Sequence, residues 1–272
     1  MTKIQNFIDE LKSKAEKRYN DFKEIDKIST ISTIKEDSYL EKPTWVGGDN
    51  KFVCLFVDLD KSSKISFKKH PLTMAKIYDY FTQTLVDVFN NDSFCADYVD
   101  VKGDGAFAIY EGDHASYKAF YAAITFRKIF EEEIKTKFQD DEGGNLSCKI
   151  GIHKDKILVK KIGKRGDYNE VWAGRLVNNA AKLSKEYEKS PEKFNSALSP
   201  IIISEEVYKD FEVHPEFGLY NCHDNGIDIL NQKKPVFTEV TDFSDDTLGD
   251  KFYFTQVGWC VHCADNYIDQ LN

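Results

Sequence analysis

The sequence predicts an α+β fold with a ferredoxin-like antiparallel sheet and helices on one face. The main observation is the order of its apolar segments after residue 50, which alternate as strand, helix, strand, strand, helix and strand. The second is composition, because 41% hydrophobic and 14% aromatic residues in a chain of 272 are enough to bury a substantial core.

The first segment, residues 3–25, places Ile4, Phe7, Ile8 and Leu11 near helical spacing among charged residues, which predicts an amphipathic helix. A Ser/Thr-rich stretch follows and has the composition of a linker. We therefore expect an N-terminal helical extension and linker over residues 1–45, a core domain over 46–211, and a C-terminal elaboration over 212–272 packed on the core. The Gly47-Gly48-Asp49 triplet precedes the first core strand, so it is interpreted as part of the linker.

The core begins with "KFVCLFVDLD", an unbroken apolar run that predicts a buried strand with Asp58 at its end. The stretch "YVDVKGDGAFAIY", residues 98–110, predicts two strands joined by a tight turn. Helices are expected over residues 73–90, 114–138 and 174–188, with two strands inside "NLSCKIGIHKDKILVKKIG" and a strand and a helix inside "SPIIISEEVYKDF". The residues after 211 are rich in Asn, Asp and Gly until the strand-like "KFYFTQVGWC".

Composition also excludes several classes of protein. A formal net charge of -9 argues against a nucleic-acid partner or an anionic membrane surface. The N-terminus has no apolar signal core and no stretch approaches a membrane span, so we expect a cytosolic protein.

The six cysteines are scattered along the chain, which favours reduced thiols over disulfides. Cys260 and Cys263 form one CxxC without a second pair of ligands, which favours ordinary thiols and leaves zinc binding open.

Charged residues on the predicted hairpin point to chemistry. Asp100 and Lys102 alternate with valines, and Asp104 lies at the turn between two glycines. Alone, Asp104 is an ordinary turn residue, since Asp-Gly is common in hairpins. If the strand that ends at Asp58 lies beside this hairpin, the two carboxylates converge and repel each other. Mg²⁺ or Mn²⁺ would relieve that repulsion, which is the pattern of a two-metal phosphoryl-transfer site.

Three ordered blocks resemble the motifs of class III nucleotidyl cyclases across about residues 51–210: "FVDLDKSSKIS", "DVKGDGAFAIY", and "GIHKDKILVKKIG" with "DYNEVWAGRLVNNAAKL". The resemblance implies a homodimer with active sites at its interface and two Mn²⁺ or Mg²⁺ ions per site. Asp58, Asp104 and the backbone carbonyl of Leu59 would be the metal ligands.

The resemblance also assigns the partner subunit's contribution to each site. Asn178 would orient the ribose and Lys182 would steady the triphosphate, as their spacing of four places them on one helix face. Most members have Arg where this chain has Lys182, and a lysine cannot grip two oxygens in a planar fork. Arg175 is therefore expected to share in nucleotide binding. The nearby Lys160, Lys161 and Lys164 are an alternative, although a solvated basic face suits these three lysines better. In the implied reaction the ribose 3′-hydroxyl attacks the α-phosphorus and diphosphate leaves.

The base-reading positions depart from those of adenylyl cyclases, because Asp100 stands where a lysine usually reads adenine. Its carboxylate would accept a hydrogen bond from guanine, uracil or the amino group of cytosine. Phe56, on the same strand face as Asp58, would narrow the pocket toward a pyrimidine, although a core role suits it equally well.

These features resemble the bacterial pyrimidine cyclases of Pycsar antiphage defence, whose cyclic UMP or cyclic CMP activates a separate effector protein. UTP is the favoured substrate. CTP, GTP and a catalytically silent nucleotide-binding regulator remain alternatives.

Overall fold

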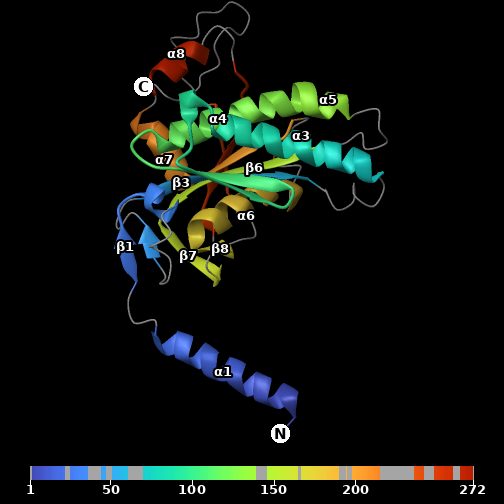
Figure 1. Ribbon diagram of the computed structural model, residues 1–272. Helices are drawn as coiled ribbons and strands as arrows, with labels where there is room; N and C mark the ends of the chain where they lie inside the picture. Colours follow the sequence, from blue (N-terminus) through green and yellow to red (C-terminus); the bar gives the residue numbers. More distant parts are fainter. Residues whose placement is uncertain are drawn as a thin grey trace, which may run out of the picture. The chain divides into compact units, whose positions relative to one another are not determined.

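The computed structural model describes most of the chain, in the following residue ranges: 2–21, 25–35, 44–46, 51–60, 70–138, 146–164, 167–189, 194, 198–214, 236–241, 248–259 and 264–271. The chain forms two compact units (Figure 1). The N-terminal unit comprises Met1–Asn50 and Lys156–Ala173, and the core unit comprises Lys51–Asp155 and Gly174–Asn272. Within the described residues no helix is long and apolar enough to cross a bilayer.

The N-terminal unit contains the predicted amphipathic helix α1 (Lys3–Asp21), none of whose residues is buried, and a short 3₁₀ helix η1 (Ile31–Lys35). Its sheet has the order β1-β2-β7-β8. The strands are β1 (Asp26–Ile28), β2 (Thr44–Val46), β7 (Ile157–Lys164) and β8 (Asp167–Ala173). The β7–β8 hairpin thus groups with the N-terminal residues, although it falls inside the core domain expected from the sequence.

The core unit is built on a seven-stranded sheet with the order β10-β11-β9-β6-β3-β5-β4. The strands are β3 (Phe52–Leu59), β4 (Tyr98–Lys102), β5 (Gly105–Tyr110), β6 (Cys148–Asp155), β9 (Ile201–Ser204), β10 (Thr238–Val240) and β11 (Phe252–Thr255). The predicted first strand, β3, lies in the middle and pairs antiparallel with both β5 and β6. Its charged end is therefore flanked by strands on both sides.

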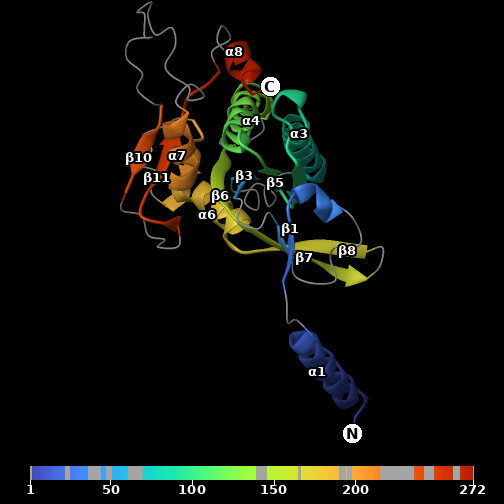
Figure 2. The same cartoon turned by 90° about the vertical axis from the view of Figure 1, so that its left-hand side faces the viewer.

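Helices cover both faces of this sheet (Figures 1 and 2). They are α3 (Pro71–Phe89), η3 (Asp92–Phe94), α4 (Ala115–Ile129) with a π-helical continuation η4 (Phe130–Ile134) and α5 (Lys135–Lys137), α6 (Arg175–Lys189), α7 (Glu205–Val213) and α8 (Ala264–Asp269). Alternate residues of β3, namely Val53, Leu55 and Val57, share one hydrophobic core with α3, α4 and α7.

The α+β class is confirmed, with two differences from the sequence prediction. First, α6 lies on the face opposite α3 and α4, so helices are not confined to one face (Figure 2). Gly151 of β6 permits this packing, because a Cβ there would lie 2.1 Å from the carbonyl oxygen of Ala180. Second, β9 pairs parallel to β6, which makes the sheet mixed. Parallel pairing requires a long connection, and here β7, β8 and α6 provide it.

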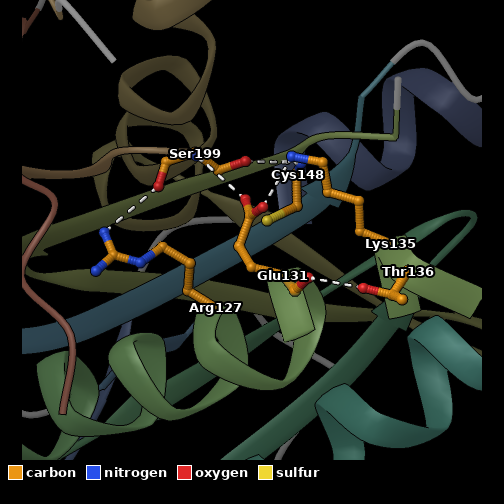
Figure 3. A network of polar contacts seen from close by, with 6 residues as sticks. All are labelled: Arg127, Glu131, Lys135, Thr136, Cys148 and Ser199. Atoms are coloured by element: carbon orange, nitrogen blue, oxygen red, sulfur yellow. Dashed lines mark hydrogen bonds and ion pairs between the residues drawn. The ribbon is translucent and has the colours of Figure 1, made fainter. Parts of the chain in front are cut away.

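The residues after 211 are less irregular than the sequence indicates, because β10 and β11 extend the sheet beyond β9. A buried arginine helps to fix this edge: Arg127, 3% exposed, donates to the carbonyl oxygens of Ser199, Thr255 and Val257. Figure 3 shows the neighbouring polar network, in which the Ser199 hydroxyl accepts from the Cys148 amide at 3.2 Å. The C-terminal strands are therefore bonded directly to α4 and β9.

Among the described cysteines, Cys54 and Cys148 are buried free thiols and Cys95 is an exposed one, as the scattered pattern predicts. Burial raises the pKa of Cys148 to about 12, so its thiol stays protonated at neutral pH. Cys260 and Cys263 lie outside the described residues, as does the Gly47-Gly48-Asp49 triplet.

Candidate active site

The structure brings the hairpin turn beside the end of β3. Asp58 lies opposite Gly105 in the β3–β5 ladder, and the backbone N–H of Leu59 donates to the Asp104 carbonyl oxygen at 3.3 Å. Gly103 adopts φ +64°, a left-handed conformation that favours glycine. A Cβ on Gly105 would lie 2.8 Å from Asp58 Oδ1, so the second glycine gives the carboxylate its space. The two glycines of the motif therefore place Asp104 next to Asp58.

The two aspartates interact electrostatically. Burial, followed by the nearby charge of Asp104, raises the pKa of Asp58 to about 6. Lys149 and Lys185 act in the opposite direction but do not cancel this effect. A pair of half-buried carboxylates that resist ionising together suits a hard divalent cation with oxygen ligands. Among the described residues no group of three or more His, Cys, Asp or Glu side chains forms a metal-binding cluster.

The predicted base-reading residues lie in one row across the same face of the sheet. Asp100 pairs with Phe107, Phe107 with Phe56, and Phe56 with Gly151. Directly paired residues project to the same face, and Phe56 lies two residues before Asp58, so this row borders the aspartate pair. Phe56 is half-buried and Phe107 is buried, which gives the row an aromatic floor.

Helix α6 presents its two predicted catalytic residues away from the sheet. Its buried residues include Leu176, Ala180 and Leu183, which pack inward. Asn178 and Lys182 each lie two positions from Ala180, almost opposite it around the helix. Asn178 is exposed, and its amide donates to the Gly174 carbonyl oxygen at 2.8 Å. The structure does not turn these two side chains toward the sheet face that carries Asp58 in the same chain.

Arg175, predicted to contact the nucleotide, is engaged within its own chain. Its Nε lies 2.8 Å from Asp155 Oδ2, and its Nη2 donates to Asp155 Oδ1 at 3.5 Å. Asp155 is buried at the end of β6. This fork links the first turn of α6 to the end of β6, and the Arg175 side chain stays 74% exposed.

Sequence reasoning missed a charged cluster that adjoins Asp58. Lys149 lies opposite Asp58 in the β3–β6 ladder, and its Nζ is 3.2 Å from Asp60 Oδ1 and 2.8 Å from Glu188 Oε1. Burial opposes ionisation of Asp60, but hydrogen bonds with Glu188, Ser147 and Lys149 outweigh it and hold its pKa below the ordinary value. The cluster joins β3, β6 and the last turn of α6. The available signal was the second aspartate of "FVDLD", which shares a strand face with Asp58.

Solved structures identify the fold. The adenylyl cyclase CyaB of P. aeruginosa superposes with a TM-score of 0.53 at 16% identity, covering 77% of this chain and 95% of that one. A guanylyl cyclase, Cya2, gives 0.55 at 14%, covering 78% and 93%. The guanylyl cyclase domain of the RhoGC fusion protein of Blastocladiella emersonii, described as a non-canonical dimer, gives 0.50 at 14%, covering 75% and 93%. The chain therefore has the class III nucleotidyl cyclase fold.

Curated relatives are more specific, although no family model matches the sequence. The chain is 32% identical over 177 residues to a uridylate cyclase of Propioniciclava tarda, covering 63% of this chain and 53% of the relative. It is 33% identical over 141 residues to a uridylate cyclase of Micromonospora echinofusca, covering 50% and 46%. The chain thus spans about half the length of these curated relatives. Both of these curated relatives are named uridylate cyclases.

Proposed function

We propose that this protein is a nucleotidyl cyclase that converts UTP to 3′,5′-cyclic UMP and diphosphate. The observation that carries the proposal is the convergence of Asp58 and Asp104 at the end of β3, in a cyclase fold, beside an aromatic row that ends in Asp100. The likeness to curated uridylate cyclases supports the choice of base.

In this proposal Asp58, Asp104 and the Leu59 carbonyl hold two Mn²⁺ or Mg²⁺ ions. Bound divalent ions would neutralise the triphosphate and lower the pKa of the 3′-hydroxyl. The ribose 3′-oxygen then forms a bond to the α-phosphorus, the bond from that phosphorus to the bridging oxygen breaks, and the hydroxyl proton leaves to solvent. The half-buried aspartates supply fixed negative charge for this purpose, at the cost of their mutual repulsion in the absence of cations.

We assign Asn178 and Lys182 to the active site of the partner subunit in a homodimer. Their placement on α6, turned away from their own sheet, supports this assignment, as does the dimeric form of one fold neighbour. Asn178 would orient the ribose, and Lys182 would hold the triphosphate as a point charge. Arg175, which pairs with Asp155 while its side chain stays 74% exposed, would share in nucleotide binding.

The proposed biological role follows from the Pycsar likeness of the sequence. Cyclic UMP would be a second messenger in antiviral defence, and a separate effector protein would bind it. Because this step needs no nucleic acid or membrane, the net charge of -9 is compatible with it.

The experiment is incubation of the full chain with ATP, GTP, CTP and UTP separately, with Mn²⁺ or Mg²⁺, and identification of products by mass spectrometry. The expected main product is cyclic UMP, formed from UTP. CTP is expected to give either no cyclic product or less of it than UTP gives. Cyclic CMP or cyclic GMP as the main product would overturn the base assignment. No cyclic product from a folded protein with any triphosphate would overturn catalysis and indicate a nucleotide-binding regulator.

A further inference from the structure

We propose that Lys102 is a second specificity-determining residue and that it reads uracil together with Asp100. This inference rests on the proposed function and deepens it. The two side chains lie two residues apart on β4, so they project to the same face, and Lys102 Nζ lies 2.7 Å from Asp100 Oδ2. The acceptor predicted to read the base is thus already held by a cation.

The position of Lys102 relative to the aspartate pair supports a role at the substrate. Lys102 lies opposite Gly105 in the β4–β5 ladder, and Gly105 lies opposite Asp58 in the β3–β5 ladder. Lys102 and Asp58 are therefore two strands apart in one row, roughly 10 Å between backbones. The residue between them has no side chain, so nothing in that row separates the ammonium from the space over Asp58.

Exposure distinguishes this pair from an ordinary surface ion pair. The Asp100 side chain is 17% exposed and the Lys102 side chain 48%. A carboxylate largely removed from water needs a partner, because burying an unpaired charge is costly. The ammonium, in contrast, remains accessible and can donate in several directions. The simpler interpretation is that Lys102 protects an edge strand from pairing with other chains, since β4 is the last strand of the sheet.

The chemistry of the bases favours a reading role. Uracil presents its N3–H between two carbonyl oxygens, so a carboxylate that accepts from N3–H also faces those oxygens. An ammonium beside the carboxylate supplies a donor to one carbonyl and offsets the repulsion. Cytosine and adenine instead present an amino group beside a ring nitrogen, and a carboxylate without Lys102 would suit that amino group. Guanine has an N–H flanked by one carbonyl and one amino group, so the pair could also accept it, and exclusion of guanine would rest on the narrow pocket beside Phe56. The Asp100–Lys102 pair therefore favours uracil over cytosine and adenine.

The test compares Lys102→Met with Lys102→Arg in the full chain, with kcat/KM measured for UTP and CTP. Lys102→Met should lower the UTP/CTP ratio by about 10-fold or more, the effect of losing one charge-assisted hydrogen bond. Lys102→Arg should restore most of the ratio because it keeps the donor and the charge. Lys76→Met is the matched control, because Lys76 is exposed on α3, away from the site face, and should leave the ratio unchanged.

A double variant tests whether the two residues act as one unit. Asp100→Asn combined with Lys102→Met should change the ratio by no more than the larger single change, whereas independent residues would give multiplied effects. A ratio within about twofold of wild type in an active Lys102→Met protein would overturn the inference and leave only the edge-strand role.

The proposed function is tested separately, by identifying the product that the wild-type protein forms. If that product is not cyclic UMP, the proposed function fails independently of Lys102. Binding of UTP and CTP analogues with an uncleavable α,β bond measures the same ratio without turnover. In that assay, equal discrimination by wild type and Lys102→Met would overturn the inference even for a catalytically silent chain.

Discussion

The two faces of the core sheet differ in role, although the same strands form both: one face packs in the hydrophobic core and the other carries the candidate active site. On one face Val53, Leu55 and Val57 of β3 are buried under α3 and α4. On the other face their immediate neighbours Phe56 and Asp58 are half-buried, Phe56 in the row that leads to Asp100 and Asp58 in the adjacent row. Because a strand alternates its side chains, stability and proposed chemistry fall on odd and even positions of one segment. Adjacent substitutions should therefore have separable effects.

The largest effect is expected on the site face. Asp58→Asn and Asp104→Asn should each lower cyclic UMP formation by roughly 10³-fold or more, because each removes an anionic metal ligand needed in the transition state. Activity measured by mass spectrometry, with circular dichroism to check the fold, provides the test. Asp97→Asn, at a half-buried aspartate preceding β4, is a control for loss of a carboxylate elsewhere. Activity within tenfold of wild type in either site variant would contradict the assignment.

Neighbouring substitutions on β3 sharpen the comparison between faces. Leu55→Ala should lower the free energy of unfolding by about 2–5 kcal/mol through a cavity under α4, without changing the preferred base. Phe56→Ala should cost less stability and should widen the pocket, raising turnover of purine triphosphates relative to UTP. Urea denaturation and the product profile measure the two effects. If Phe56→Ala lowered the free energy of unfolding as much as Leu55→Ala and left the preferred base unchanged, Phe56 would be a core residue only.

The charged cluster of Lys149, Asp60 and Glu188, which adjoins Asp58 on the site face, should contribute more to stability than surface ion pairs do. Lys149→Met would leave Asp60 and Glu188 without their cation, and Lys149 is only 10% exposed, so a loss of about 3 kcal/mol is expected. Lys128→Met is the matched control, since its pair with Glu132 is exposed and should contribute less than about 1 kcal/mol. Similar urea midpoints for both variants would show that the cluster is not a structural clamp.

The smallest expected effect is a pH dependence. Since the pKa of Asp58 is raised to about 6, its neutral form favours folding, and that contribution is lost as pH rises through 6. After allowance for solvent screening, metal-free protein should lose about 1 kcal/mol between pH 4 and pH 7 from this group, and Asp58→Asn should remove the loss. Urea unfolding in EDTA at both pH values measures the difference. An identical pH profile in Asp58→Asn would contradict the electrostatic account.

Local patterns in the sequence predicted much of the core. The apolar run of β3 and the alternation around Gly103 are encoded by neighbouring residues, so both strands of the hairpin were found. The helix expected over residues 73–90 is observed as Pro71–Phe89. The prediction that all helices cover one face was wrong for α6, because the side that α6 covers depends on Gly151 meeting Ala180 across a long connection.

The same distinction applies to the site. The proximity of Asp58 and Asp104 followed from motifs whose spacing could be compared with a known family. The fork between Arg175 and Asp155 and the contacts of Lys149 involve residues far apart in sequence, and single charged residues carry no periodic signal. These tertiary ion pairs required the structure.

Mn²⁺ binding tests the central claim, that Asp58 and Asp104 hold divalent ions together. Titration of the full chain, with an uncleavable UTP analogue present, should be followed by electron paramagnetic resonance for wild type, Asp58→Asn and Asp104→Asn. We predict that each single substitution weakens Mn²⁺ binding by at least about 10-fold, because both carboxylates contribute to one site. Wild-type affinity in either variant would contradict the claim.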